Sequence, residues 1–206
     1  NGSGVPLSKL SLSKEENIYI AEQLKKIMDN MHSHKRKFVC LSTHFKGENW
    51  YDFIQCYMNL YAQKVLEYKD ITKEEYNFIL NILEKNKNYF LSVSLNYLHG
   101  DVNEDNICYD AKRKKVYLID YDDCLIGDTL YEYARLFQYT HIPSIKIIKE
   151  KYFKNIEENE IFLIYYLRNI MLDYCFRKVN KMDATSLVNS IHRVLEKIKE
   201  LNDVDG

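Results

Sequence analysis

The sequence lacks most of the features that would assign it to a secreted, membrane or nucleic-acid-binding class. Its 206 residues include five cysteines, an odd number, and no two of them form a Cys-x-x-Cys pair. We therefore expect reduced thiols in a cytoplasmic protein. No apolar run approaches the roughly 18 residues that span a bilayer, and no secretory signal is visible. Lysine and arginine total 29 and aspartate and glutamate 30, a balance that supports neither nucleic acid nor a membrane as partner.

Proline is also scarce, at two residues, and helical periodicity dominates the chain. Ser13 with Glu16 and Thr72 with Glu75 have the capping-box pattern, in which two side chains bond reciprocally to the backbone at the start of a helix. Apolar residues recur at helical spacing after both pairs. Further helices are expected over about 48–68, from Asp128, near Pro143, over 159–179 and after Asp183.

Residues 95–121 depart from this helical pattern. Residues 95–98 form a short apolar segment, and 106–109 and 116–121 have the composition of two strands joined by a polar turn. A chain of 206 residues has the length of one domain. We therefore predict an α+β fold, predominantly α-helical, with one small β-hairpin in its middle.

The polar residues of this central segment are spaced for phosphoryl transfer. His99, Asp101 and Asn106 give H-x-D-x-x-x-x-N, and Ile119-Asp120 follows one hairpin later. Phosphoryl transfer needs placement and charge neutralisation more than covalent help. Asn106 and Asp120 offer the hard oxygen ligands that Mg²⁺ prefers, and the hairpin can bring them together. Asp101 can accept a proton from an incoming hydroxyl, and His99 would hold the backbone of the loop.

These residues resemble the catalytic signature of kinases. Residues 99–101 (His-Gly-Asp) with 119–120 (Ile-Asp) are most similar to the aminoglycoside phosphotransferase and choline kinase superfamily. Residues 127–134 resemble the G-D-x-x-Y-D/E-x-A stretch of antibiotic phosphotransferases. Residues 4–7 resemble the segment just after the inter-lobe linker, and 21–33 the first large helix of the C-terminal lobe.

The resemblance implies the C-terminal catalytic lobe of a protein-kinase-like fold. Within it, 1–12 would follow the linker, 13–94 would be helical, 95–126 would carry the catalytic loop and metal-binding hairpin, and 127–206 would form a helical acceptor-binding part. Such kinases also have an N-terminal nucleotide-clamp lobe with a lysine on its third strand, and residues 1–206 contain no counterpart. We expect this missing lobe to be a partner from the same protein. We also expect the present chain alone to bind ATP weakly and to turn over negligibly.

The resemblance also assigns roles position by position. Asp101 matches the catalytic base, and Asn106 and Asp120 match the metal ligands. His99 and Asp128 match residues that give the site structural support. The implied cofactors are Mg²⁺ and ATP or GTP, with a small-molecule alcohol as the acceptor.

We therefore predict a Mg²⁺- and ATP-dependent transfer of the γ-phosphate to a small-molecule hydroxyl, with an aminoglycoside-type antibiotic as the first choice of acceptor. Two alternatives stay open: a kinase for choline, ethanolamine or another metabolite, and a non-catalytic binding module built on a kinase lobe. Acidic groups attract amines, so charge makes Glu132 and Asp173 candidates for contacting an amine-bearing acceptor.

Overall fold

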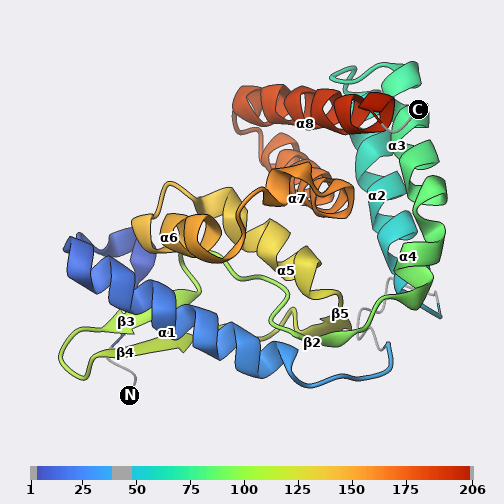
Figure 1. Cartoon of the computed structure of the whole chain (residues 1–206). Coiled ribbons are helices and arrows are strands. Elements are labelled where there is room, and N and C mark those ends of the chain that lie inside the picture. The colour runs from blue at the N-terminus through green and yellow to red at the C-terminus, as the bar shows by residue number, and fades with distance from the viewer. Residues whose placement is uncertain (1–3, 39–47, 205–206) are drawn as a thin grey trace. The chain divides into compact units, whose positions relative to one another are not determined.

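The structure is a computed structural model that describes residues 4–38 and 48–204 (Figure 1). The chain forms two compact units, each assembled from separate stretches of sequence. The first unit consists of Asn1–Cys40 and Ser94–Ile156, and the second of Leu41–Val93 and Glu157–Gly206. The segments expected from the sequence do not coincide with these units, because 13–94 is divided after Cys40 and 127–206 after Ile156.

The first unit combines three α-helices with two small sheets. Its helices are α1 (Lys14–His32), α5 (Thr129–Leu136) and α6 (Pro143–Tyr152), with 3₁₀ turns η1 (Leu7–Lys9), η2 (Phe137–Tyr139) and, where the chain passes to the second unit, η3 (Ile156–Glu158). Figure 1 shows α1 lying alongside the strands. The fully buried core residues include Ile20, Leu24, Met28, Leu98, Val102, Ile107, Leu136, Ile145 and Ile148.

Both sheets of the first unit are antiparallel. One has the strand order β1 (Val5–Pro6), β3 (Ile107–Asp110), β4 (Lys115–Leu118), and the other pairs β2 (Asn96–Leu98) with β5 (Leu125–Gly127). In the β3–β4 hairpin Ile107 pairs with Leu118 and Asp110 with Lys115. The expected hairpin is therefore confirmed, and β1 and the pairing of β2 with β5 add strand contacts that the sequence did not indicate. Strands of two or three residues are too short to show the alternation of apolar and polar residues that predicts a strand.

The helix starts follow the sequence closely. Ser13 Oγ accepts from the N–H of Glu16 at 3.1 Å while Glu16 accepts from the N–H of Ser13 at 2.9 Å, and Thr72 and Glu75 repeat this arrangement. Both predicted capping boxes are thus confirmed. Pro143 is the first residue of α6, where its missing N–H leaves no helical bond unmade.

The second unit is wholly helical in its described residues. Its helices are α2 (Trp50–Glu67), α3 (Lys73–Lys85), α4 (Lys87–Ser92), α7 (Glu160–Val179) and α8 (Thr185–Val204). In its core the indole N–H of Trp50 donates to the hydroxyl of Tyr165 at 2.8 Å. The guanidinium of Arg168 lies 5.6 Å from the ring centre of Tyr57 and 5.2 Å from that of Tyr61, so this buried cation is covered by aromatic faces.

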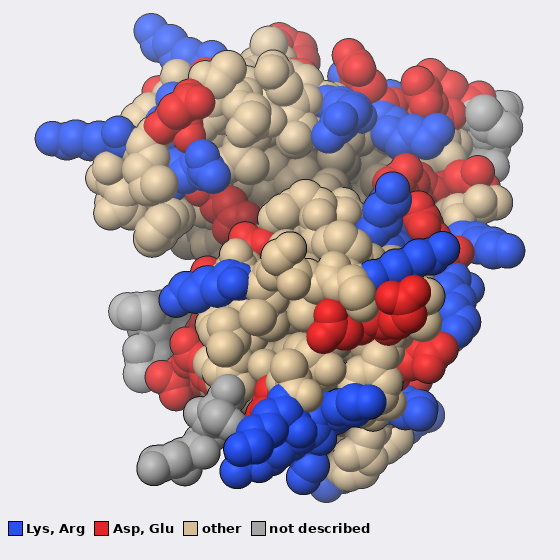
Figure 2. All heavy atoms as spheres, turned by 90° about the vertical axis from the view of Figure 1, so that its left-hand side faces the viewer, with Lys and Arg blue, Asp and Glu red and all other residues tan. Residues whose placement is uncertain are grey.

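The described surface carries both signs of charge. Figure 2 shows basic and acidic side chains interspersed over much of the face that it displays. Across residues 4–38 and 48–204, no helix is both long and apolar enough to cross a membrane. Cys56, Cys108, Cys124 and Cys175 are free thiols, and Cys40 lies outside the described residues.

Candidate active site

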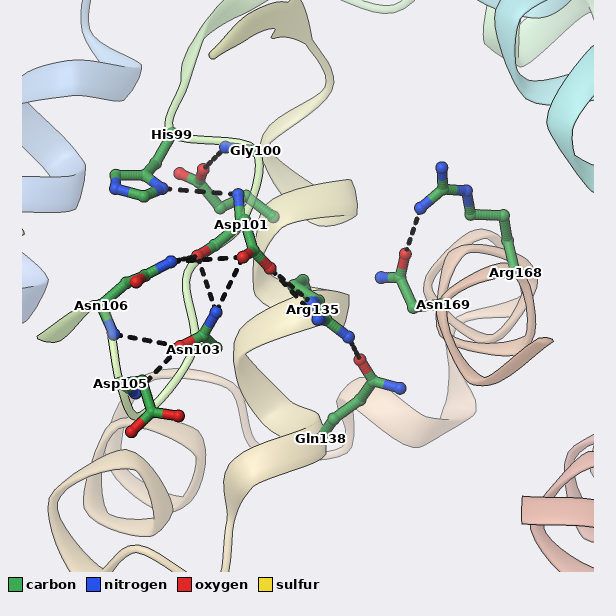
Figure 3. A network of polar contacts seen from close by, with 11 residues as sticks. His99, Gly100, Asp101, Asn103, Asp105, Asn106, Arg135, Gln138, Arg168 and Asn169 are labelled. Atoms are coloured by element: carbon green, nitrogen blue, oxygen red, sulfur yellow. Dashed lines mark hydrogen bonds and ion pairs between the residues drawn. The ribbon is translucent and has the colours of Figure 1, made fainter. Parts of the chain in front are cut away.

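The predicted catalytic residues lie on the loop 99–106, which joins β2 to β3 in the first unit (Figure 3). Asn103 gives this loop its shape. Its side-chain Oδ1 accepts from the N–H of Asp105 at 2.9 Å and from the N–H of Asn106 at 3.0 Å. Asparagine makes such local turns readily, so the sequence itself bends the chain back toward the hairpin.

The carboxylate of Asp101 is held at both of its oxygens. Oδ1 accepts from Nε of Arg135 at 3.1 Å and lies 3.1 Å from Nη2 of the same guanidinium. Oδ2 accepts from the side-chain amides of Asn103 at 2.8 Å and Asn106 at 3.2 Å. The side chain keeps an exposed fraction of 30%, so a small molecule can reach it. A partly exposed carboxylate in a fixed orientation is suited to accept a proton.

The amide of Asn106 has a defined orientation. Its Nδ2 donates to the backbone oxygen of Asp101 at 3.0 Å as well as to Oδ2. A carboxylate can only accept, so the nitrogen must face Asp101 and Oδ1 of Asn106 must point elsewhere. No residue of the described ranges donates to that Oδ1. It is therefore an amide oxygen available to a hard cation.

Two hydrogen bonds from the loop fix the residue that precedes Asp120. The N–H of Ile119 donates to the backbone oxygen of Asn106 at 3.0 Å, and Nε2 of the buried His99 contacts the backbone oxygen of Ile119 at 2.8 Å. The N–H of Asp101 points at Nδ1 of His99 at 3.4 Å, so Nδ1 accepts and Nε2 carries the proton. Asp120 follows immediately, with an exposed side chain and a φ of +62°, a left-handed conformation that aspartate adopts more readily than most residues.

Gly100 is braced by the buried side chain of Glu132. Its N–H donates to Oε1 of Glu132 at 2.9 Å, and Oε2 of Glu132 contacts Nε2 of His32 at 2.5 Å. The expectation that Glu132 contacts the acceptor does not fit this geometry, because the residue is 1% exposed and both of its oxygens are occupied. Gly100 itself has a φ of +88°, and a Cβ there would lie 2.0 Å from the carbonyl oxygen of Asp123.

Asp128 and Asp173 are the remaining expected site residues. Asp128 is buried at the start of α5, and its Oδ1 accepts from the N–H of Leu130 at 3.0 Å, which confirms it as the helix N-cap. Asp173 lies on α7 of the second unit, so its contact with an acceptor stays a prediction. Arg168 and Asn169, also drawn in Figure 3, belong to that second unit, where Arg168 donates to Asn169 at 2.9 Å.

Sequence reasoning missed three contributors to the site. Arg135 contacts the predicted base, Asn103 shapes its loop, and His32 supports Glu132 from the end of α1. For Asn103 the signal was present, since asparagine within a polar loop favours a side-chain-bonded turn. For Arg135 and His32 the pairing is purely tertiary, across 34 and 100 residues respectively.

The oxygen ligands fit Mg²⁺ better than a softer metal. Residues 4–38 and 48–204 contain no group of three or more His, Cys, Asp or Glu side chains placed to hold a metal. Asn106 and Asp120 instead offer one amide oxygen and one carboxylate. Mg²⁺ commonly keeps several waters and takes one or two protein carboxylates together with substrate phosphates, which suits such a small ligand set. Burial raises the pKa of the Cys124 thiol in the turn after Asp120, so this thiol stays protonated.

A family comparison accounts for this arrangement. Residues 4–153 match the model of the family described as phosphotransferase enzyme family. The chain belongs to the phosphotransferase family. The matched range contains the whole network, from His32 through the 99–106 loop to Arg135. A comparison with curated proteins finds no match for this phosphotransferase.

Solved structures share the fold of this phosphotransferase. A thermostable mutant of aminoglycoside phosphotransferase APH(4)-Ia, in ternary complex with AMP-PNP and hygromycin B, superposes with a TM-score of 0.71 at 16% identity, over 96% of this chain and 70% of that one. Choline kinase LicA from Streptococcus pneumoniae gives 0.60 at 15% identity, over 96% and 68%. Such low identities establish the fold alone. The predicted superfamily and its α+β kinase-like fold are thereby confirmed.

Proposed function

We propose that this phosphotransferase moves the γ-phosphate of Mg²⁺-bound ATP to a hydroxyl of a small molecule, with an aminoglycoside-type antibiotic as the first acceptor to test. One observation carries the proposal: the loop that holds Asp101 bonds to both sides of the residue before Asp120. Hydrogen bonds thereby link the loop that carries Asp101 and Asn106 to the residue next to Asp120, which supports a shared site for the candidate base and the candidate metal ligands. Phosphoryl transfer requires this combination of a hydroxyl-binding carboxylate and hard oxygen ligands.

In the proposed reaction Asp101 orients the acceptor hydroxyl and accepts its proton. The hydroxyl would approach the exposed part of this carboxylate and replace one of the donors that contact it. Asn106 and Asp120 would hold Mg²⁺ through Oδ1 and the carboxylate, and Mg²⁺ supplies neutralisation of the triphosphate charge. His99 keeps the loop and the segment before Asp120 in register, and Glu132 fixes the loop at Gly100.

Two similarities support the choice of acceptor. The APH(4)-Ia structure was solved with hygromycin B, and residues 127–134 resemble a stretch of antibiotic phosphotransferases. Choline or ethanolamine is the alternative acceptor, supported by the fold shared with LicA. GTP is the alternative phosphate donor.

The test is a radiolabel-transfer assay on the full-length protein, including any segment that precedes Asn1. We expect transfer from [γ-³²P]ATP with Mg²⁺ to at least one member of a panel containing hygromycin B, other aminoglycosides, choline and ethanolamine. The matched control is Asp101→Asn, which keeps the size of the side chain and removes the base. If the wild type transfers no label to any acceptor with ATP or GTP, the proposal fails and the non-catalytic binding module becomes the better interpretation.

A further inference from the structure

The contact between Arg135 and Asp101 suggests a second functional residue. Arg135 lies near the end of α5, and its side chain is 12% exposed. Nε and Nη2 both face Oδ1 of Asp101, while Nη1 donates to Oε1 of Gln138 at 2.8 Å. The guanidinium also lies over the ring of Tyr139, 5.5 Å from its centre. The cation is thus oriented on three sides, and Figure 3 shows it directed at the carboxylate.

Arg135 also brings a positive charge to two segments that contain acidic but no basic side chains. The loop 99–106 and the segment 118–124 contain no lysine or arginine. Their acidic residues are Asp101, Glu104, Asp105, Asp120, Asp122 and Asp123. Among the described residues, Arg135 is the one lysine or arginine that forms an ion pair with any of these acids. Of these six acids, Asp101 is thus the one that pairs with a described lysine or arginine.

The two oxygens of Asp101 are held by different kinds of donor. Oδ1 faces two N–H groups of a cation at 3.1 Å, and Oδ2 faces two neutral amides at 2.8 and 3.2 Å. A carboxylate has about four lone-pair directions, so these donors fill it. An acceptor hydroxyl must therefore replace one of them, and the two bonds from the arginine are the stronger ones because both partners carry a charge. The longest of these bonds is the 3.2 Å bond from Nδ2 of Asn106. When the acceptor hydroxyl replaces it, Nδ2 still keeps its 3.0 Å bond to the backbone oxygen of Asp101.

We propose that Arg135 is a positioning residue for phosphoryl transfer, which clamps Oδ1 of Asp101 and so makes Oδ2 the atom that receives the proton. The inference rests on the proposed function. As the acceptor oxygen bonds to the γ-phosphorus, its proton passes to Oδ2. The bond from that phosphorus to the bridging oxygen breaks, and its electron pair leaves with the nucleoside diphosphate. Without Arg135 only Oδ2 is held, and the carboxylate can rotate away from the acceptor.

The first test compares variants at Arg135 in the full-length protein. Loss of alignment at a reacting group costs about 10²-fold, so we expect R135Q to lose about 10²-fold in kcat with KM for ATP unchanged. R135K keeps the charge but lacks the planar fork, and should recover only part of the loss. R135A should regain activity when methylguanidinium is added, a rescue that a merely structural role would not produce.

The matched control is R113Q. Arg113 forms an arginine–aspartate pair with Asp110 at 3.0 Å in the same unit, on the hairpin turn, with a side chain that is 59% exposed. We expect its kcat to equal that of the wild type. The proposal is overturned if R135Q matches R113Q in kcat, if the loss falls in KM for ATP, or if methylguanidinium fails to rescue R135A while R135A melts at the wild-type temperature.

A second measurement needs no activity and separates this proposal from the proposed function. Exchange of the Arg135 Nε–H with solvent, followed by NMR, should be slow in the wild type and fast in D101A, because the bond to Oδ1 protects that proton and alanine has no oxygen to accept it. An inactive wild type with slow exchange would refute the proposed function and leave the clamp intact. Fast exchange in an active wild type would refute the clamp alone.

Discussion

The two units of this phosphotransferase are stabilised in different ways. In the first unit, polar contacts join segments far apart in sequence: Gly100 to Glu132, His99 to the backbone of Ile119, and Asp101 to Arg135. In the second unit, long helices pack around apolar and aromatic side chains, and its buried polar contacts, such as Trp50 with Tyr165, link one helix to another.

This difference predicts different roles for the two units. Aligned polar groups are what a transfer reaction needs, and fixed bonds keep them aligned before substrate arrives. The first unit concentrates such bonds at the loop 99–106. The second unit buries large side chains that stabilise its helices without fixing a reacting atom. Substitutions in the loop 99–106 and at the side chains bonded to it should therefore change turnover, and those in the core of the second unit should change stability.

The largest expected effect is that of Asp101→Asn. Removal of a general base costs about 10²–10⁴-fold in rate, and asparagine cannot take the proton. We expect kcat of the full-length protein to fall within that range while the melting temperature stays near that of the wild type. Turnover that survives within a few-fold would show that Asp101 is not the base and would remove the chemical distinction between the units.

The next effect is that of Glu132→Ala, which should change both stability and turnover. It removes one partner of a buried pair and leaves His32 and the N–H of Gly100 without their acceptor. Each buried polar group left without its partner costs about 1–3 kcal/mol, so with two such groups urea unfolding should show a loss of about 2–6 kcal/mol. Glu132→Gln keeps an oxygen for Gly100 and should lose less. Wild-type stability in the alanine variant would contradict the bracing role.

Much of the helical fold could be predicted because helix signals are local. The capping boxes at Ser13 and Thr72, the N-cap at Asp128 and the proline at 143 each specify a helix start within a few residues of sequence. The strand β1 and the pairing of β2 with β5 could not be predicted in this way. Their pairing partners lie far along the chain, as Val5 pairs with Tyr109 and Tyr97 with Ile126.

The candidate site likewise combines local patterns, which the sequence shows, with tertiary contacts, which it does not show. The spacing of His99, Asp101 and Asn106 is a local pattern, and it was visible in the sequence. The contacts of Arg135 and Glu132 depend on how α5 packs against the loop, so charge alone suggested an acceptor contact for Glu132 where the structure has an internal brace. Local spacing therefore identifies the reacting groups, and packing identifies the groups that hold them.

The third expected effect concerns the stability of the second unit at low pH. Burial raises the pKa of Asp70, but the hydroxyl of Tyr174, at 2.5 Å, and the ammonium of Lys178, at 2.9 Å, together lower it below its usual range. The ionised carboxylate therefore stabilises the fold above about pH 4, and this stability is lost as the pH falls through the lowered pKa.

Asp70→Asn should accordingly lose about 1.5–3 kcal/mol at pH 7, since hydrogen bonds to a charged group are being replaced. The difference between variant and wild type in urea unfolding should shrink as the pH is lowered from 5 to 3. Turnover per folded molecule at pH 7 should be unchanged. A difference that grows in acid would reverse the sign of this linkage and contradict it.

The smallest effects come from a matched pair of helix caps, Ser13→Ala in the first unit and Thr72→Ala in the second. Each removes a capping bond worth about 1 kcal/mol. If the two units unfold together, both variants shift one common transition in a calorimetric scan. If they unfold separately, each variant shifts only the transition of its own unit, and two transitions would be resolved.

The bonds that hold the residue before Asp120 have a consequence for substitutions at that position. Both run to the peptide backbone of Ile119, and the side chain of Ile119 is 43% exposed. These bonds therefore do not depend directly on which side chain stands at position 119. Only proline, which has no N–H to give to Asn106, is forbidden there. A change of Ile119 to a residue other than proline would thus keep this anchoring, even though Ile119 is part of the Ile-Asp pattern that carries the resemblance to the superfamily.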